Sequence, residues 1–175
     1  MKISKKMTIG EFAALVASHL ESKGISTVLT GGAVVSIYTE NKYMSYDADF
    51  ISPTDHKTIN KAMLELGFEN HGKDFRHKNS DFFVEFPSGP LAIGDMLVNA
   101  EAELKFKGHK LRLLSPTQSV MDRLAAYFHW NDLQCLDQAT WIAEKHPVNI
   151  TKIRKWAKRE GDDEKFKIFL ANLKK

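Results

Sequence analysis

Two aspartates stand one residue apart in the stretch "DADFIS", residues 47–52 of this 175-residue chain. The stretch alternates acidic and apolar residues with a period of two, which predicts a half-buried β-strand. On such a strand Asp47 and Asp49 point to the same face, with Cα atoms roughly 6.5 Å apart. The two carboxylates repel each other, and a divalent cation is the simplest means of relieving that repulsion. Mg²⁺ is the expected ion, since it takes oxygen ligands and binds through one or two carboxylates together with phosphate oxygens.

A third acid for such a centre is expected from a later strand. The stretch "DFFVEF", residues 81–86, predicts a strand in which Glu85 is flanked by apolar residues. Asp81 is the alternative, because it lies four residues earlier and shares the face of Glu85. We prefer Glu85, since Val84 and Phe86 enclose it whereas Asp81 stands at the polar start of the strand. Three carboxylates from two strands suit a two-metal centre for phosphoryl transfer.

A glycine pair precedes the two aspartates in the chain. Gly31 and Gly32 follow the β-branched run "ISTVLT" and precede the stretch "AVVSIY", which predicts a strand, a tight turn and a short helix. Glycine at this turn allows backbone N–H groups and the positive end of the helix to approach a phosphate group. Ser36 and Lys42 lie between the glycines and the aspartates, and we expect them to add a hydroxyl and a cation to the same triphosphate site.

The sequence predicts that these residues belong to an α/β domain that extends to about residue 115. Thr8 and Glu11 form a capping-box pattern at the start of a first helix, and Ser52-Pro53 predicts the start of a second. The stretch "ELKFKGHKLRLL", residues 103–114, predicts a hairpin that turns near Gly108. The segment "PSGPLAIGD", residues 87–95, reads as a loop, either a wall of the active cleft or a buried connection.

The stretch Ser115-Pro116-Thr117-Gln118 predicts another helix cap, and from there to the end the chain shows only helical patterns, over roughly 117–130, 132–145, 150–160 and 163–173. We therefore expect an α/β domain over residues 1–115 and a helical region over residues 116–175 packed on it. In the first of these helices Arg123 and Tyr127 lie one turn apart. Either Arg123 contacts the triphosphate and Tyr127 a base, or Arg123 pairs with Asp122 or Asp132 and Tyr127 packs at the boundary.

Composition restricts the class of protein. Cys135 is the only cysteine, which excludes an intramolecular disulfide and a cysteine-rich zinc site. No apolar run reaches about 18 residues and no signal-peptide pattern opens the chain, so we expect a cytoplasmic protein without membrane association. The net charge is +3, but residues 145–175 carry ten Lys and Arg against four Asp and Glu. This basic segment, with Trp156 at its centre, is either an RNA-binding surface or the solvated face of terminal helices.

The glycine pair, the Asp-x-Asp strand and the later acid together resemble the nucleotidyltransferase (DNA polymerase β-like) superfamily. The matching residues are Gly31, Gly32, Asp47, Asp49 and Glu85, and the resemblance covers residues 25–90. The stretch "GGAVVSIY…KYMSYDADF" is most similar to the minimal bacterial branch of AbiEii-type toxins and MNT-type proteins, in which a basic residue and a Ser or Thr precede the acidic pair. Lys42 and Ser45 stand in those positions.

The resemblance implies a nucleotidyltransferase-like mixed sheet flanked by helices, with a C-terminal helical region. It also implies that Asp47, Asp49 and Glu85 bind Mg²⁺, with Glu85 helping to activate an acceptor hydroxyl. The implied reaction moves a nucleoside monophosphate from a nucleoside triphosphate, such as ATP, to RNA, protein or a small molecule, with release of pyrophosphate. Two other functions remain open: a binding protein of the same fold, such as a toxin-antitoxin component, and an RNA-binding adaptor.

Overall fold

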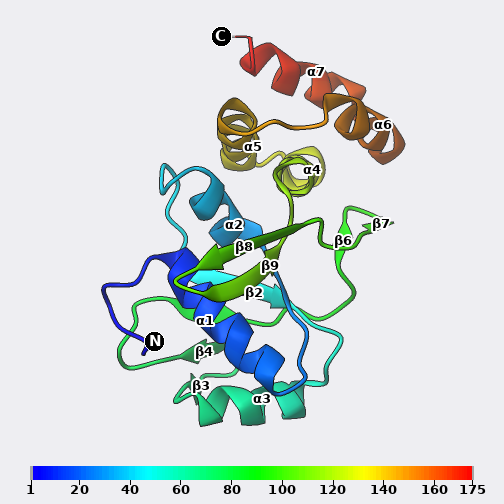
Figure 1. Cartoon of the computed structure of the whole chain (residues 1–175). Helices are drawn as coiled ribbons and strands as arrows, with labels where there is room; N and C mark the ends of the chain where they lie inside the picture. The colour runs from blue at the N-terminus through cyan, green and yellow to red at the C-terminus, as the bar shows by residue number, and fades with distance from the viewer. Residues whose placement is uncertain (1, 175) are drawn as a thin grey trace.

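The computed structural model describes residues 2–174 as a mixed α/β protein (Figure 1). Seven strands form one mixed sheet in the order β3-β4-β5-β2-β1-β9-β8, and β6 and β7 form a separate hairpin. The strands are β1 (Val28–Thr30), β2 (Asp47–Ile51), β3 (Glu69–Asn70), β4 (Asp74–Arg76), β5 (Phe83–Glu85), β6 (Ala92–Ile93), β7 (Met96–Leu97), β8 (Ala102–Phe106) and β9 (His109–Leu113). The helices are α1 (Ile9–Ser22), α2 (Gly31–Tyr38), α3 (His56–Glu65), α4 (Pro116–Trp130), α5 (Leu133–Lys145), α6 (Ile150–Glu160) and α7 (Asp163–Asn172). The predicted fold class is confirmed.

The centre of the sheet combines both strand directions. Strand β2 pairs antiparallel with β1 and parallel with β5, while β1 pairs parallel with β9. The parallel pairs join strands that are distant in the sequence, so segments from residues 28–30, 47–51, 83–85 and 109–113 lie side by side. This order brings the "DADFI" and "FVE" stretches into direct contact.

The two faces of the sheet differ in their surroundings. Ala48 and Phe50 of β2 are fully buried, whereas Asp47 and Asp49, on the opposite face, are half-buried. Helices α1 and α2 cover the apolar face, where α1 contacts β9 and α2 contacts β2. The main hydrophobic core therefore lies on one side of the sheet, and the carboxylates of β2 lie on the other.

The C-terminal helices are stacked at one end of the molecule, beyond the sheet (Figure 1). Helix α4 contacts α2, α5, α6 and α7, so it joins the helical layer to the sheet layer. The side chains of Phe128 and Trp156 stack between α4 and α6, with ring centroids 5.5 Å apart. The change from strands to helices falls between Leu113 and Pro116, and the division into domains at residue 115 remains a prediction. No helix within residues 2–174 is both long and apolar enough to cross a lipid bilayer.

The predicted helix caps are confirmed at two positions. The Thr8 hydroxyl accepts from the N–H of Glu11, whose carboxylate accepts from the N–H of Thr8 in return. Ser115 and Gln118 form the same reciprocal cap at the start of α4. The predicted start of the second helix at Ser52-Pro53 is wrong, because Asp55 accepts from the N–H of Thr58 and starts α3 three residues later. The Ser52 hydroxyl instead donates to the carbonyl of Ser26, at 2.7 Å.

Four short strands, β3, β4, β6 and β7, were not predicted from the sequence. Strands β3 and β4 extend the sheet beyond β5, and the β6–β7 hairpin lies within the predicted loop and just after it. Each has only two or three residues, too few for a period of two to be recognised. The predicted hairpin of β8 and β9 is confirmed, and its turn lies at Lys107-Gly108.

We expect Tyr38→Phe to lower the free energy of unfolding by about 1–2 kcal/mol. The buried Tyr38 hydroxyl donates to the carbonyl of Leu114, at 2.8 Å, and so ties α2 to the segment before α4. The substitution leaves that carbonyl without its donor. Urea denaturation followed by circular dichroism measures the change. The matched control is Tyr46→Phe, at a side chain that is 52% exposed; equal losses in the two variants would contradict this role for the Tyr38 hydroxyl.

Candidate active site

Carboxylates from neighbouring strands form a row across the open face of the sheet. In the strand register Asp49 of β2 lies opposite Thr30 of β1 on one side and Glu85 of β5 on the other, and Glu85 lies opposite Asp74 of β4. Side chains at paired positions share one face of a sheet, and Asp47 shares it too because it is two residues from Asp49. The sheet thus brings Asp47, Asp49 and Glu85 together, although Glu85 is distant from the aspartates in the sequence.

Asp81 lies elsewhere. It precedes β5, is exposed, and forms an ion pair with Lys5 at an N–O distance of 2.9 Å. Of the two acids considered for the third ligand, Glu85 is therefore the one that faces Asp49.

Ser45 and Ser36 hold the acidic strand against α2. The Ser45 hydroxyl donates to the carboxylate of Asp47 through a short hydrogen bond. The Ser36 hydroxyl accepts from the N–H of Ser45, at 2.8 Å, and donates to the carbonyl of Gly32, at 3.2 Å. Ser36 is 1% exposed, so its hydroxyl is engaged in this contact and is not presented to a ligand in the structure. The expectation that Ser36 binds phosphate directly has no support in this arrangement.

The two glycines meet different requirements. Gly31 has φ of +70°, and a Cβ there would lie 2.6 Å from the Oδ2 atom of Asp49. A Cβ on Gly32 would lie 2.8 Å from the Ser45 hydroxyl oxygen, so this glycine is required by packing of the loop before β2. Thr30, the N-cap of α2, makes no side-chain hydrogen bond to the helix, so no side-chain cap occupies the first-turn N–H groups. The tight turn predicted at the two glycines is replaced by the first turn of α2, which begins at Gly31 directly after β1, and the backbone at Gly31 borders the cavity.

Lys42 lies away from the acidic row. Its ammonium group is 4.6 Å from the centre of the Trp141 ring and 3.9 Å from the carboxylate of Glu144, both on α5. Its side chain is half-exposed. The loop before β2 therefore directs Lys42 toward the helical region, and the predicted contact with a triphosphate would need a different position of this side chain.

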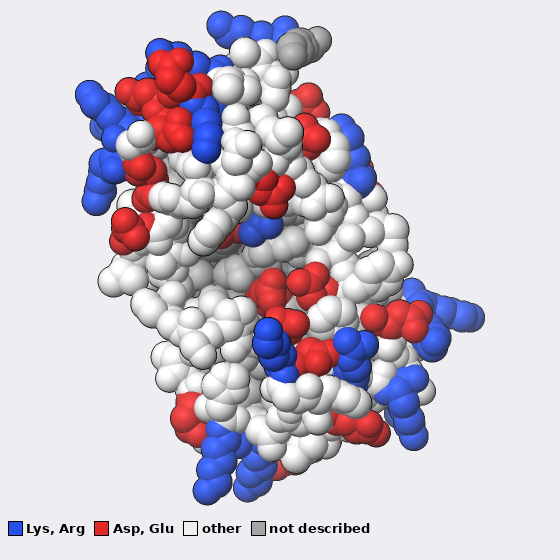
Figure 2. Space-filling model, turned by 180° about the vertical axis from the view of Figure 1, so that it is seen from behind, with Lys and Arg blue, Asp and Glu red and all other residues white. Residues whose placement is uncertain are grey.

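A cavity of about 270 Å³ opens beside Asp49. Figure 2 shows a hollow across the middle of this molecule's surface, with acidic side chains gathered along it. Thr30 and Gly31 form one side of the cavity, Asp122 and Arg123 of α4 form another, and the segment Pro87–Ala92 contributes a third. Of the two interpretations of this segment, the structure supports a wall of the cleft.

Arg123 faces this cavity but already has an acidic partner. Its Nη2 and Nε atoms lie 2.6 and 3.1 Å from the Oδ2 atom of Asp122, and Nη1 lies 3.5 Å from Gln138. Tyr127 is 3% exposed and therefore cannot stack on a base in this conformation. The predicted pairing of Arg123 with Asp122 is confirmed, and it holds the guanidinium at the edge of the cavity.

The electrostatic environment of Asp49 reflects this arrangement. Burial, together with the nearby charges of Asp47 and Glu85, raises the pKa of the Asp49 carboxyl to about 6, while Arg123 partly opposes the shift. A carboxyl that is hard to ionise among other carboxylates is typical of a site arranged to receive positive charge.

The donors present suit a divalent cation in chemical type. Carboxylate oxygens from Asp47, Asp49 and Glu85 are the hard ligands that Mg²⁺ prefers, and the charges of Asp47 and Glu85 add to burial in raising the pKa of Asp49. Among residues 2–174, no group of three or more His, Cys, Asp or Glu side chains converges closely enough to hold a metal ion. The row therefore offers the ligands of a cation site on one face without enclosing one in this conformation.

Two acids near the site were not identified from the sequence. Asp74 pairs with Glu85 in the register of β4 and β5, but a three-residue strand gives no readable pattern. Asp122 was considered only as a partner of Arg123, yet it lines the cavity and raises the pKa of Asp49. The position of Asp122, beside Arg123 and next to the apolar stripe of the helix, was the one feature of the sequence that could have indicated its place near the site.

Replacing Asp49 by Asn should stabilise the protein at neutral pH. The pKa of Asp49 is higher in the folded state than its ordinary value of 3.8, so stability is lost as the pH rises through about 6. At about pH 7.5 the substitution should add about 1–2 kcal/mol to the free energy of unfolding, and at about pH 4 much less. Urea denaturation at both pH values measures this, with Asp81→Asn as the exposed control. A gain independent of pH would show that the charge of Asp49 is not its cause.

Gly31→Ala should destabilise the protein by about 1–3 kcal/mol and displace the Asp49 carboxylate. Alanine at this position would have to adopt the left-handed backbone conformation of Gly31, and its Cβ would collide with the carboxylate of Asp49. Thermal unfolding measures the loss of stability, and Gly72→Ala is the control, because Gly72 also has positive φ but has open space around its Cα. Similar losses in the two variants would show that backbone strain alone is responsible.

Comparison with solved structures finds the same fold in two nucleotidyltransferase-related proteins. One is an antigenic nucleotidyltransferase-like protein from Paracoccidioides brasiliensis, with a TM-score of 0.60 and 18% identity over 98% of this chain and 89% of that chain. The other is the antibiotic-resistance factor ANT(2'')-Ia, with a TM-score of 0.51 and 12% identity over 95% of this chain and 90% of that chain. No family model and no curated protein matches the sequence. The likenesses show that the chain has a nucleotidyltransferase-like fold.

Proposed function

We propose that this chain is a nucleotidyltransferase that moves a nucleoside monophosphate from a nucleoside triphosphate to an acceptor hydroxyl and releases pyrophosphate. The observation that carries the proposal is the register of β2 and β5, which places Asp47, Asp49 and Glu85 on one face beside Gly31 and a cavity. The nucleotidyltransferase-like fold of the two solved structures supports it. Membership of the AbiEii/MNT branch, and a role with a toxin-antitoxin partner, are finer proposals that rest on the sequence resemblance alone.

Asp47, Asp49 and Glu85 would hold Mg²⁺, which when bound would screen the triphosphate and stabilise charge on the transferred group. The backbone at Gly31 and the positive end of α2 would lie next to the phosphate chain. Arg123, held at the cavity edge by Asp122, would supply positive charge from the opposite side. Catalysis would consist mainly of positioning and electrostatic stabilisation, as in other phosphoryl transfers.

Glu85 has a second proposed role toward the acceptor. It lies opposite Asp49 in the sheet, on the face that Asp47 also shares, and its side chain is half-buried. From this position it would orient the acceptor hydroxyl and take its proton as the new ester bond forms. The segment Pro87–Ala92 would limit the access of water on that side of the cavity.

Asp49→Asn and Glu85→Gln should each reduce transfer at least about a hundredfold, because each removes a carboxylate proposed to hold the Mg²⁺ that stabilises charge on the transferred group. The assay incubates the full chain with nucleoside triphosphates labelled at the α-phosphate, Mg²⁺ and cell extract, and detects any labelled acceptor. Asp81→Asn is the matched control, since Asp81 is an acid that precedes the same strand but pairs with Lys5. Parental activity in either site variant would refute the proposed assignment.

A second function, nucleotide binding without turnover, is favoured by one observation. In the part of the chain that the structure describes, the acids do not converge into a metal-binding group, and Lys42 contacts α5 rather than the cavity. Thermal-shift titration with each triphosphate, with and without Mg²⁺, separates the two functions. A shift that requires Mg²⁺ supports the enzyme, whereas a shift without Mg²⁺ and without label transfer supports the binding protein.

A further inference from the structure

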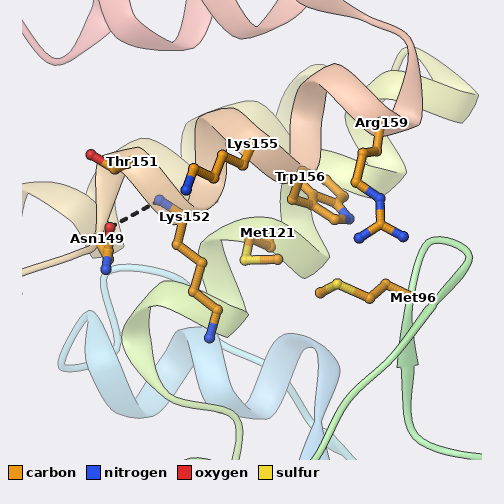
Figure 3. Close-up of a pocket in the computed structure, with 8 residues that line it drawn as sticks. All are labelled: Met96, Met121, Asn149, Thr151, Lys152, Lys155, Trp156 and Arg159. Atoms are coloured by element: carbon orange, nitrogen blue, oxygen red, sulfur yellow. Dashed lines mark hydrogen bonds between the residues drawn. The ribbon is translucent and has the colours of Figure 1, made fainter.

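A second and larger cavity, of about 510 Å³, lies between α6, α4 and the β6–β7 hairpin. Met96 of β7 and Met121 of α4 form its apolar side, and residues of α6 form the other (Figure 3). It shares no lining residue with the cavity beside Asp49. Its volume falls within the range of about 300–1,000 Å³ that is usual for small-molecule sites. Nothing in the proposed nucleotide transfer uses it.

The charge of this cavity is entirely positive. Lys152, Lys155 and Arg159 line it from one face of α6, and no acidic residue does. Lys152 is neutralised by Glu101, at an N–O distance of 2.5 Å. Lys155 and Arg159 are exposed, and neither has an ion pair or side-chain hydrogen bond with another residue of the described chain. Two unpaired cations therefore border an apolar cavity.

Trp156 adds a buried donor without a partner. Its side chain is 3% exposed and stacks on Phe128, but the indole N–H makes no hydrogen bond within residues 2–174. Figure 3 shows the indole nitrogen directed toward the gap between the Arg159 guanidinium and Met96. Leaving a buried donor unpaired is costly, and Arg159, which lines the same cavity, is a second donor without an acceptor in the described chain.

We propose that this cavity binds a small organic anion, a carboxylate or phosphate monoester with an apolar body. An anionic oxygen accepts from the Trp156 indole and the Arg159 guanidinium, while Lys155, whose ammonium group points toward the Asn149 end of α6 in Figure 3, adds positive charge to the cavity as a whole. The apolar body covers Met96 and Met121. Met96 and Arg159 are long, flexible side chains, so a small displacement of either opens the indole N–H to the ligand.

The arrangement favours a small molecule over nucleic acid. Single-stranded nucleic acid is held by aromatic faces on which bases stack, and the ring of Trp156 is buried against Phe128. The unpaired indole donor lies within a concave site, whereas a nucleic-acid surface offers its donors along an open groove. The apolar lining from two methionines has no function toward a phosphate backbone. Binding of RNA is thus the competing outcome in the test.

The test follows the three tryptophan indole N–H resonances of the full chain by ¹⁵N NMR during titration with octanoate and, separately, octyl phosphate. The Trp156 signal is assigned by its loss in Trp156→Phe. We expect it to shift with saturation, while the signals of Trp130 and Trp141, which do not line the cavity, stay in place. The relative affinities of octanoate and octyl phosphate distinguish a carboxylate ligand from a phosphate ligand.

Calorimetry of the variants tests the donors. Arg159→Gln should weaken octanoate binding about tenfold, the size expected for one hydrogen bond to a charged group. Lys158→Gln is the matched control, because Lys158 is an exposed cation of the same helix that does not line the cavity, and its affinity should equal that of the parent. Arg159 is exposed, so its replacement leaves the core intact.

Three outcomes would overturn the proposal. The first is no shift of the Trp156 signal at millimolar octanoate or octyl phosphate. The second is equal affinity for octanoate, 1-octanol and octylammonium, which would show that the anion is not recognised. The third is a shift of the same signal by single-stranded RNA but by neither octyl anion. None of these outcomes depends on nucleotidyltransferase activity.

Discussion

Repulsion among carboxylates on one face of the sheet is the constraint on which the candidate site depends. A strand that alternates acid and apolar residues must bury one set and expose the other, and β2 buries Ala48 and Phe50 completely. The same register then fixes Asp47 and Asp49 on the opposite face, where β5 adds Glu85. The apolar core thus forces the acids together, and the pKa of Asp49 is raised by burial first and then by the charges of Asp47 and Glu85.

Contacts around β2 hold the carboxylates of Asp47 and Asp49 in position. Ser45 binds Asp47, Ser36 binds the backbone of Ser45, and Gly32 gives the space that the Ser45 hydroxyl occupies. Gly31 allows the Asp49 carboxylate to lie against the first turn of α2. These contacts are local, yet they connect the glycine turn to the acidic strand across fourteen intervening residues, 33–46. The start of α2 and strand β2 are therefore joined by hydrogen bonds and close packing.

Patterns with a clear period predicted the framework. The alternation in β2, the caps of α1 and α4, and the helical periodicity of α1, α4 and the later helices depend on residues close together in the chain, so the sequence predicted them. The start of α3 was not correctly predicted, because Ser52 and Asp55 are both good caps and only the contact of Ser52 with Ser26 decides between them. Strands β3 and β4 owe their existence to pairing with β5 rather than to any period of their own.

Residue types identified the acids, but tertiary contacts decided the other site residues. Glu85 could be preferred to Asp81 because a carboxylate between apolar residues of a strand is costly to bury unless a cation or a hydrogen-bond donor meets it. Ser36 and Lys42 were predicted as phosphate-binding residues because they lie between the glycines and the aspartates in the chain. The sequence did not indicate their actual partners, the backbone of Ser45 and the ring of Trp141. Long, flexible side chains such as that of Lys42 have many reachable partners, so spacing alone constrains them weakly.

Helix α4 determines the geometry of both cavities. Consecutive residues of this helix point in different directions, so Met121 lines the cavity next to α6 while Asp122 and Arg123 line the one beside Asp49. The hairpin after β5 completes both: Ala92 lines one cavity and Met96 the other, and Glu160 accepts from the N–H of Asp95 at its tip. The Ser115–Gln118 cap and the stacking of Phe128 on Trp156 hold α4 in place, and α4 in turn supplies lining residues to both cavities.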